Sequence, residues 1–241
     1  MDDLLLVLGV ASLSAFLTFL GAPAAEWLDV PQRAVSGALQ FASGVITAIV
    51  AFSLMPPAVQ IGPQGWVVLS FFAGGALFVA LEYYSARLLA SRSGGSERSV
   101  GLYLGILVDL VIDGAVIGVG ATLSLGTGLL LALGMAVSTA PLAFVTTATA
   151  KRQGVSLGWR RVLAGSFVVA IIGGAMLGYL VLRNQALDLR LLIVGLASGF
   201  LITTVTQSLI PEANREGEPR LAGLLYMGGL SLYALFTLGV K

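Results

Sequence analysis

Apolar stretches of about 20 residues follow one another along almost the whole chain, and they restrict it to folds that sit in a lipid bilayer. A helix of about 20 apolar residues is long enough to cross the hydrocarbon core of a membrane. The eight stretches are residues 3–22, 34–56, 66–89, 100–124, 127–150, 160–182, 189–210 and 221–239. Only 10% of the residues are charged, against about 25% in soluble domains. The sequence therefore predicts an all-α, polytopic membrane protein, with residues 1–241 forming one domain of eight transmembrane helices.

The first stretch also has features of a cleaved signal peptide, because its apolar run is followed by Ala22-Pro23-Ala24. Signal peptides begin with a basic region, however, whereas this chain begins Met1-Asp2-Asp3. We therefore expect the stretch to serve as the first membrane helix.

Lysine and arginine are shared unevenly between the two sides of the membrane. If the N-terminus is outside, eight spans leave the C-terminus outside too, and the outer side carries Arg183, Arg190 and Lys241. The cytoplasmic loops then carry ten basic residues: Arg33, Arg87, Arg92, Arg98, Lys151, Arg152, Arg160, Arg161, Arg215 and Arg220. Basic residues collect on the cytoplasmic side of membrane proteins. The sequence thus predicts a multi-pass protein of the cell (plasma) membrane with both termini outside.

The chain contains neither cysteine nor histidine. Disulfides and thiolate metal sites are therefore excluded, and the usual proton shuttle of neutral pH is missing. A bound metal would have to be held by oxygen, which suits hard cations such as Mg²⁺, Ca²⁺ and Mn²⁺. A net charge of +1 gives no reason to expect a nucleic-acid partner. With so few reactive side chains in the spans, we do not expect an enzyme.

The most informative polar residues are Asp109 and Asp113, which lie inside the stretch 100–124. Four residues apart on a helix, they share one face. Each charge near the membrane midplane costs about 2.5–3.5 kcal/mol on insertion scales. Two carboxylates this close repel each other in a low dielectric, so either a cation bridges them or one holds a proton. The structural alternative is that both form hydrogen bonds to neighbouring serine and threonine side chains.

Apart from Glu82 and charged residues near the span ends, the other polar residues in the spans are neutral. Serine, threonine and glutamine recur in stretches 34–56, 127–150 and 189–210, which suggests a polar seam between helices. A single hydroxyl in a membrane helix more often bonds back to its own helix. Pro141 lies inside a span, where a kink would free backbone carbonyls. The glycine pairs Gly114–Gly118, Gly174–Gly178 and Gly195–Gly199 predict close helix packing, and no strict repeat is evident.

Three segments carry a resemblance to a known family. Phe41-Ala42-Ser43-Gly44-Val45 through Ser53-Leu54-Met55-Pro56-Pro57-Ala58 resembles a pattern Ala-Ala-Gly-Val…Leu-Leu-Pro-Glu-Ala. Ala197-Ser198-Gly199 through Ser208-Leu209-Ile210-Pro211-Glu212-Ala213 resembles a counterpart ending Glu-Glu-Leu-Ile-Pro-Glu-Ala, and Asp113-Gly114 falls where an acidic-Gly pair is expected. In this order, and with eight spans, they make the chain similar to the ZIP family of metal-ion transporters over nearly its whole length.

The chain departs from that family at most metal-binding positions. A His-Asn pair of the family is Asp109-Leu110 here, and the fifth-helix ligand after Pro141 is Leu142. The sixth-helix Glu-Pro is replaced by Ile171-Ile172, and the seventh-helix Glu-Glu by Gln207-Ser208. Only Asp109 and Asp113 stay ionisable, so a binuclear zinc site cannot be assembled.

The resemblance implies two bundles, with spans one, four, five and six moving against spans two, three, seven and eight in an elevator-type step. It implies transport of one divalent cation, of the zinc, iron or manganese class, as substrate and with no permanent cofactor. The implied ligands are Asp109, Asp113, Ser138 and Thr139, and the route would be lined by Gln40, Ser53, Gln207 and Ser208. Partners are the bilayer, the cation and, as an open alternative, a second copy of the chain. The other hypothesis is a ZIP-fold protein that has lost metal transport and moves another solute or serves as a receptor or structural partner.

Overall fold

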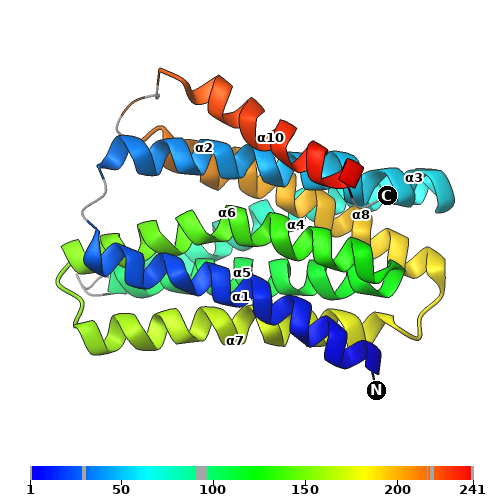
Figure 1. Cartoon of the computed structure of the whole chain (residues 1–241), viewed down its shortest axis with the longest axis horizontal. Helices are drawn as coiled ribbons and strands as arrows, with labels where there is room; N and C mark the ends of the chain where they lie inside the picture. Colours follow the sequence, from blue (N-terminus) through cyan, green and yellow to red (C-terminus); the bar gives the residue numbers. More distant parts are fainter. Residues whose placement is uncertain (1, 29–30, 91–96, 216, 218–219, 240–241) are drawn as a thin grey trace.

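The structure of the protein is a computed structural model that describes residues 2–28, 31–90, 97–215, 217 and 220–239. Every regular element in these ranges is a helix, as Figure 1 shows. Arg92, which the sequence analysis assigns to a cytoplasmic loop, lies outside these ranges, and the side chains of Arg87 and Arg98 are not described.

The first four apolar stretches form helices that run back and forth along the molecule. They are α1 (Asp2–Trp27), α2 (Gln32–Ala48) continued by η1 (Ile49–Leu54) and α3 (Met55–Ile61), α4 (Gln64–Ala90) and α5 (Glu97–Leu123). The last four are α6 (Leu125–Arg152), α7 (Leu157–Leu182), α8 (Leu187–Thr204) continued by η2 (Val205–Leu209) and α9 (Ile210–Ala213), and α10 (Ala222–Gly239). The segments η1 and η2 are π-helical.

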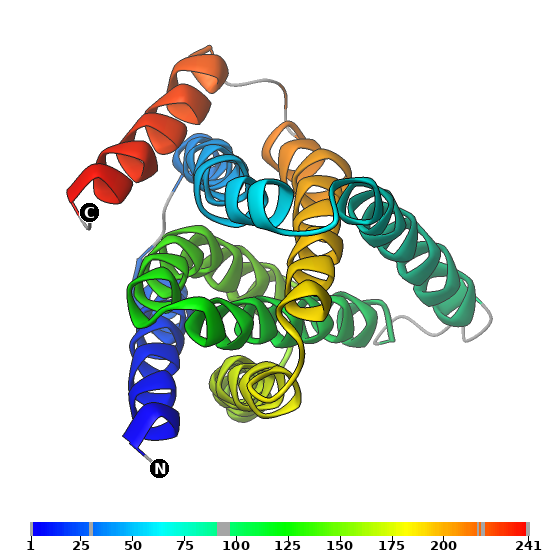
Figure 2. The same ribbon diagram turned by 90° about the vertical axis from the view of Figure 1, so that its right-hand side faces the viewer.

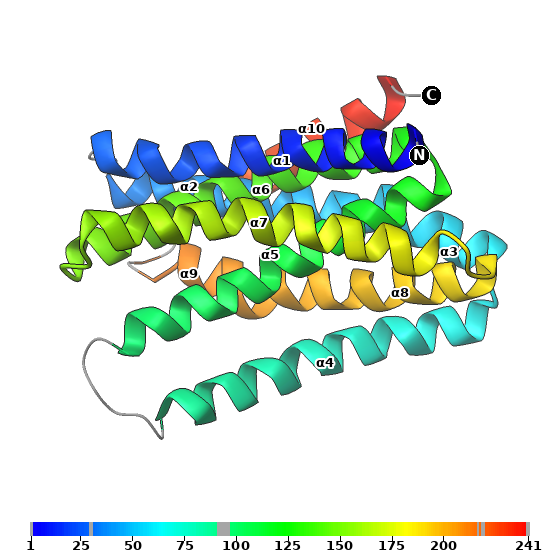
Figure 3. The ribbon, with the colours of Figure 1, turned by 90° about the horizontal axis from the view of Figure 1, so that it is seen from below.

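The all-helical prediction is confirmed for the described residues. Seven helical segments are long and apolar enough to cross a membrane, and the part of α10 from Ala222 to Leu238 is a shorter apolar helix. Most helices extend a few residues past the predicted stretches, since their polar ends continue the backbone hydrogen bonding. The helix α6 passes Pro141 as one uninterrupted element. The beginning of α1 and the end of α10 lie at the same end of the molecule (Figures 1 and 3).

The helices pack in two groups. In the first group, α5 lies along α7 and α6, and α1 lies along α6 and α7. In the second group, α2 lies along α10, and α4 lies along α8. Figure 2 shows the red α10 beside α2 at one corner and the teal α4 beside α8 at another. The groups meet chiefly where α2 packs against α6.

Glycine brings the backbones within each group into direct contact. A Cβ on Gly114 of α5 would lie 2.2 Å from the carbonyl oxygen of Ile171, and one on Gly174 of α7 would lie 2.2 Å from that of Val111. No side chain fits in such a gap. Because lipid provides no hydrophobic force between helices, close van der Waals contact of this kind holds them together. The sequence prediction of close packing at Gly114 and Gly174 is therefore confirmed.

The second group repeats one contact twice. A Cβ on Gly44 of α2 would lie 1.9 Å from the oxygen of Tyr226 on α10, and one on Gly199 of α8 would lie 1.8 Å from that of Phe71 on α4. Gly199 follows Gly44 by 155 residues, and Tyr226 follows Phe71 by the same 155. The two contacts are therefore equivalent, with the partners exchanged.

This offset reveals a degenerate internal repeat that the sequence analysis missed. Adding 155 to the residue numbers at which α1 begins and ends gives those at which α7 begins and ends. The same offset relates Ser53-Leu54 and Pro56 to the identical residues Ser208-Leu209 and Pro211. It also brings η1 close to η2, just before the prolines. Figure 1 shows α2 and α8 running in opposite directions, as inverted repeats do.

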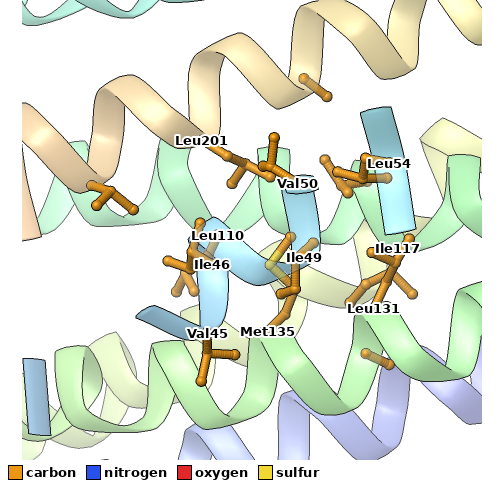
Figure 4. Close-up of a cluster of buried hydrophobic side chains, with 14 of the residues drawn as sticks. Val45, Ile46, Ile49, Val50, Leu54, Leu110, Ile117, Leu131, Met135 and Leu201 are labelled. Atoms are coloured by element: carbon orange, nitrogen blue, oxygen red, sulfur yellow. The ribbon is translucent and has the colours of Figure 1, made fainter. Parts of the chain in front are cut away.

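The boundary between the groups is filled by large apolar side chains. Figure 4 shows Ile46 and Ile49 of α2 and η1 among Leu110 of α5 and Leu131 and Met135 of α6. Each of these side chains is at most 4% exposed. The two groups therefore meet here through apolar side chains. Within each group, by contrast, glycines bring the helix backbones into direct contact.

We expect Gly44→Ala and Gly199→Ala to lower the melting temperature of the detergent-solubilised protein. Overpacking of this kind costs about 1–3 kcal/mol, and each kcal/mol is worth about 2–4 °C in a chain of this size. Gly165→Ala and Gly173→Ala are matched controls, because nothing lies within 4 Å of a Cβ at either position. Alanine favours helix over glycine, so the controls should hold or gain stability. Equal losses in all four variants would contradict the packing account.

Candidate cation site

Asp109 and Asp113 lie on α5 and are both withdrawn from solvent. Asp113 is 3% exposed. Asp109 is half-buried as a residue, but its Oδ1 atom is buried and has no hydrogen-bond partner in the described structure. One carboxylate oxygen is thus left unsatisfied beside a second buried carboxyl group.

Helix periodicity places the two aspartates away from α7. Residues are about 100° apart around an α-helix, so Gly118, which touches α7, lies on the opposite side of α5 from Asp109. Ile117 follows Asp113 by one turn and shares its face. Figure 4 shows Ile117 beside Leu131 and near Leu54, where the two helix groups meet. The aspartate-bearing face of α5 therefore continues toward the boundary between the groups.

The electrostatics of this arrangement require a further positive charge or a proton. Burial weakens the hydration of both carboxylates, and Asp109 repels Asp113. A buried polar atom without a partner costs about 1–3 kcal/mol, and a charged one costs more. A cation bound between the oxygens, or a proton held on one of them, removes this cost.

The set of charged ligands at the site is small. In the ranges that the structure describes, no group of three or more Asp, Glu, His or Cys side chains is placed to hold a metal. A cation at Asp109 and Asp113 would thus need neutral oxygens to complete its shell. Carboxylates with neutral oxygens suit hard cations such as Mg²⁺, Ca²⁺ and Mn²⁺.

Ser138 and Thr139 are the neutral ligands predicted from the sequence, and both are buried on α6. The Ser138 and Thr139 hydroxyls each lie 2.8 Å from the carbonyl oxygen of Met135, to which they donate. Thr139 Oγ1 also lies 2.5 Å from Thr18 Oγ1 of α1. Bonding within their own helix is ordinary for such hydroxyls, but each oxygen can still accept. Their part in cation binding stays a prediction.

Two of the predicted route residues have defined polar partners. Gln40 is buried, and its Nε2 donates to Asn214 Oδ1 at 2.9 Å. Ser53 Oγ lies 2.9 Å from the Tyr233 hydroxyl. Ser53 also lines a cavity of about 300 Å³ together with Thr127 of α6. This cavity contacts both helix groups, but neither the aspartates nor Ser138 and Thr139 are among the described residues that line it, so the route role of Ser53 stays a prediction.

Gln207 and Ser208 lie in η2, where Gln207 is exposed and Ser208 is half-buried. Ser208 is the repeat counterpart of Ser53 in η1. π-Helical turns inside α-helices are often found at functional sites. Ser53 and Ser208 therefore occupy equivalent positions in the two halves of the repeat. That Gln207 and Ser208 line the cation route stays a prediction.

Sequence reasoning did not single out two buried hydroxyls of α1. Thr18 is 0% exposed and bonds to Thr139, whereas Ser14 is 1% exposed and its Oγ has no partner in the described structure. The signal was their i,i+4 spacing inside an apolar stretch, which matches that of the aspartates. Tyr233 and Asn214 were also missed, because each lies far in sequence from its partner.

Comparison with known proteins adds no assignment. No family model matches the chain, and no curated protein matches it.

We expect Asp109→Asn to raise the melting temperature in metal-free buffer near neutral pH. The amide keeps the shape of the side chain and removes the buried charge, which costs more than an unpartnered neutral atom (about 1–3 kcal/mol), so the gain should be several degrees in a chain of this size. Asp188→Asn, at an exposed position in the first turn of α8, is the control and should change little. A loss of stability in Asp109→Asn alone would mean that the carboxylate has a structural partner.

Proposed function

We propose that this protein is a ZIP-like membrane transporter that moves a divalent cation through a site centred on Asp109 and Asp113. The observation that carries the proposal is the buried, unpartnered Oδ1 of Asp109, one turn before the buried Asp113. Ionisable residues inside a membrane protein usually mark a path for ions or protons. The competing structural explanation needs hydrogen bonds from serine or threonine hydroxyls, and those of Ser138 and Thr139 on α6 donate to Met135 instead.

The arrangement of the helices supports the ZIP-like part of the proposal. Spans one, four, five and six are the helices of the first group, and spans two, three, seven and eight are those of the second. This is the division that the resemblance implies. Among the described glycines, none brings a backbone of one group against a backbone of the other in the way found within the groups, so sliding there breaks fewer specific interactions. An elevator-type step, in which the first group carries the cation, fits this division.

The topology that we propose has eight spans, with α10 as the last, and both termini outside. The basic residues support it, since the end of α6 and the start of α7, which carry Lys151, Arg152 and Arg161, lie at the end of the molecule opposite to the start of α1 (Figure 1). The cell membrane is the proposed location.

Asp113→Asn and Asp109→Asn should each reduce cation uptake by purified protein in liposomes at least about tenfold, because a lost charge–charge contact of about 1.4 kcal/mol already gives that factor. Uptake is measured for Mn²⁺, Mg²⁺, Fe²⁺, Zn²⁺ and Cd²⁺ in parallel. Asp188→Asn is the control with the same change of charge at an exposed position. With oxygen ligands alone, Mn²⁺ should be taken up faster than Cd²⁺.

Undiminished flux in both variants would remove the two aspartates from the route. If the wild type takes up none of the five metals but acidifies the liposomes in a manner that depends on Asp113, then the alternative of a ZIP-fold carrier for another cation is favoured.

The orientation can be tested with single cysteines, because the natural chain has none. Asn184→Cys, between α7 and α8, should react with a membrane-impermeant maleimide on intact cells. Gly158→Cys, at the start of α7, should react only after permeabilisation. Both positions are exposed. The reverse pattern would invert the proposed topology.

A further inference from the structure

A second site is suggested by a cavity at the end of the molecule where α1 begins. Its volume is about 300 Å³, within the range of small-ligand pockets. The polar residues that line it are Thr122, Tyr179, Arg183 and Arg190, and its apolar wall includes Leu6 and Leu125. It therefore combines two guanidinium groups with an apolar surface, far along α5 from the aspartates.

Arg190 is held in place by three backbone carbonyls. Its Nε donates to the oxygen of Gln185 at 3.0 Å, its Nη1 to that of Thr122 at 3.1 Å, and its Nη2 to that of Arg183 at 2.7 Å. A guanidinium has five N–H donors, so two remain for another acceptor. Its orientation is fixed before any ligand arrives, which lowers the entropy cost of binding.

The charge of the cavity is not balanced by a carboxylate in the described structure. Among the described residues that line the cavity, none is acidic. Asp188 is the nearest described acid along the chain, but it lies two residues from Arg190 on α8, and residues at that spacing do not face each other. The carbonyls around Arg190 lie at the ends of α5 and α7, and two helix C-termini together offer about one elementary negative charge. Among the described side chains the two arginines therefore leave a net positive charge at the cavity, which favours an anion with several oxygens.

A simpler explanation of the two arginines is that Arg190 only caps two helix ends and that Arg183 is solvated. It accounts for the three carbonyl contacts, but it leaves unexplained why a second arginine and the Tyr179 ring line the same hollow. The apolar wall also continues outward, since Leu6 is 50% exposed and Leu125 is 46% exposed. A ligand with a charged head and an apolar tail matches both features.

We propose that this cavity binds the phosphate group of an anionic lipid, with Arg183 and Arg190 holding the phosphate oxygens and with the acyl chain lying along Leu6 and Leu125. Arginine forks fit phosphate in bidentate geometry. Basic pockets between membrane helices on the cytoplasmic side bind lipid head groups by the same chemistry, whereas the proposed topology places this cavity at the outer leaflet. The inference concerns neither the aspartates nor the cation, and it stands or falls separately from the proposed function.

The test is the melting temperature of delipidated protein in an uncharged detergent, with three probes. These are dioctanoyl phosphatidylglycerol, dioctanoylglycerol without a phosphate, and inorganic phosphate. We expect phosphatidylglycerol to raise the melting temperature by several degrees at saturation, because a ligand that binds only the folded state stabilises it. Dioctanoylglycerol and inorganic phosphate should do much less, since each lacks half of the recognised chemistry.

Arg183→Gln should abolish the shift with phosphatidylglycerol. Arg183 is exposed, so its loss should not prevent folding. Arg190→Gln removes three contacts to carbonyls and can lower stability by itself, so only its ligand-induced shift is compared. Arg161→Gln, an exposed arginine at the other end of α7, is the matched control and should keep the full shift.

An equal phosphatidylglycerol shift in Arg183→Gln and in Arg161→Gln would overturn the site. So would a dioctanoylglycerol shift as large as that of the phospholipid. If inorganic phosphate alone gives the full shift and Arg183→Gln loses it, the arginines recognise phosphate, but the lipid as its source is refuted.

Discussion

Direct contact between helix backbones is the interaction on which this fold depends. In lipid, apolar side chains gain little by leaving their surroundings, so helices must be held together by close packing. The chain meets this requirement with glycines placed against carbonyl oxygens, at Gly44 and Gly199 in one group and at Gly114 and Gly174 in the other. The contacts at Gly44 and Gly199 are one contact repeated at an offset of 155 residues. The pairing of helices within each group therefore rests on one kind of contact, and the inverted repeat uses that contact twice.

The boundary between the groups consists of side-chain contacts rather than backbone contacts, and the aspartates lie on the face of α5 that leads toward it. Ile46, Ile49 and Met135 fill it with apolar surface. Asp113 shares a face of α5 with Ile117, which reaches that boundary, while the opposite face is fixed to α7. Two carboxyl groups on a firmly held helix, next to an apolar boundary, would travel with the first group if it moved. A cation held there would travel with them.

Much of the fold could be predicted from the sequence, because bilayer thickness fixes the length of a span and apolar runs are easily recognised. The helical character and approximate limits of the spans follow from that alone. The pairing Gly44–Tyr226 could not be predicted so directly, since it joins residues far apart and becomes visible only beside its counterpart Gly199–Phe71. For the site, the aspartates stood out because charge in lipid is costly. Thr18 did not, because a single hydroxyl costs little and its bond to Thr139 depends on how α1 and α6 pack.

The central claim is that Asp109 and Asp113 together hold one cation. Anomalous X-ray scattering from crystals of the protein soaked in Mn²⁺ tests it most directly, because manganese is located independently of the protein atoms. The account predicts one anomalous peak about 2.0–2.6 Å from oxygens of both carboxylates, the range of metal–oxygen bonds for hard cations. It also predicts that the peak disappears in Asp113→Asn crystals of the same form. Manganese peaks elsewhere with none at these carboxylates, or a peak that persists in the variant, would contradict it.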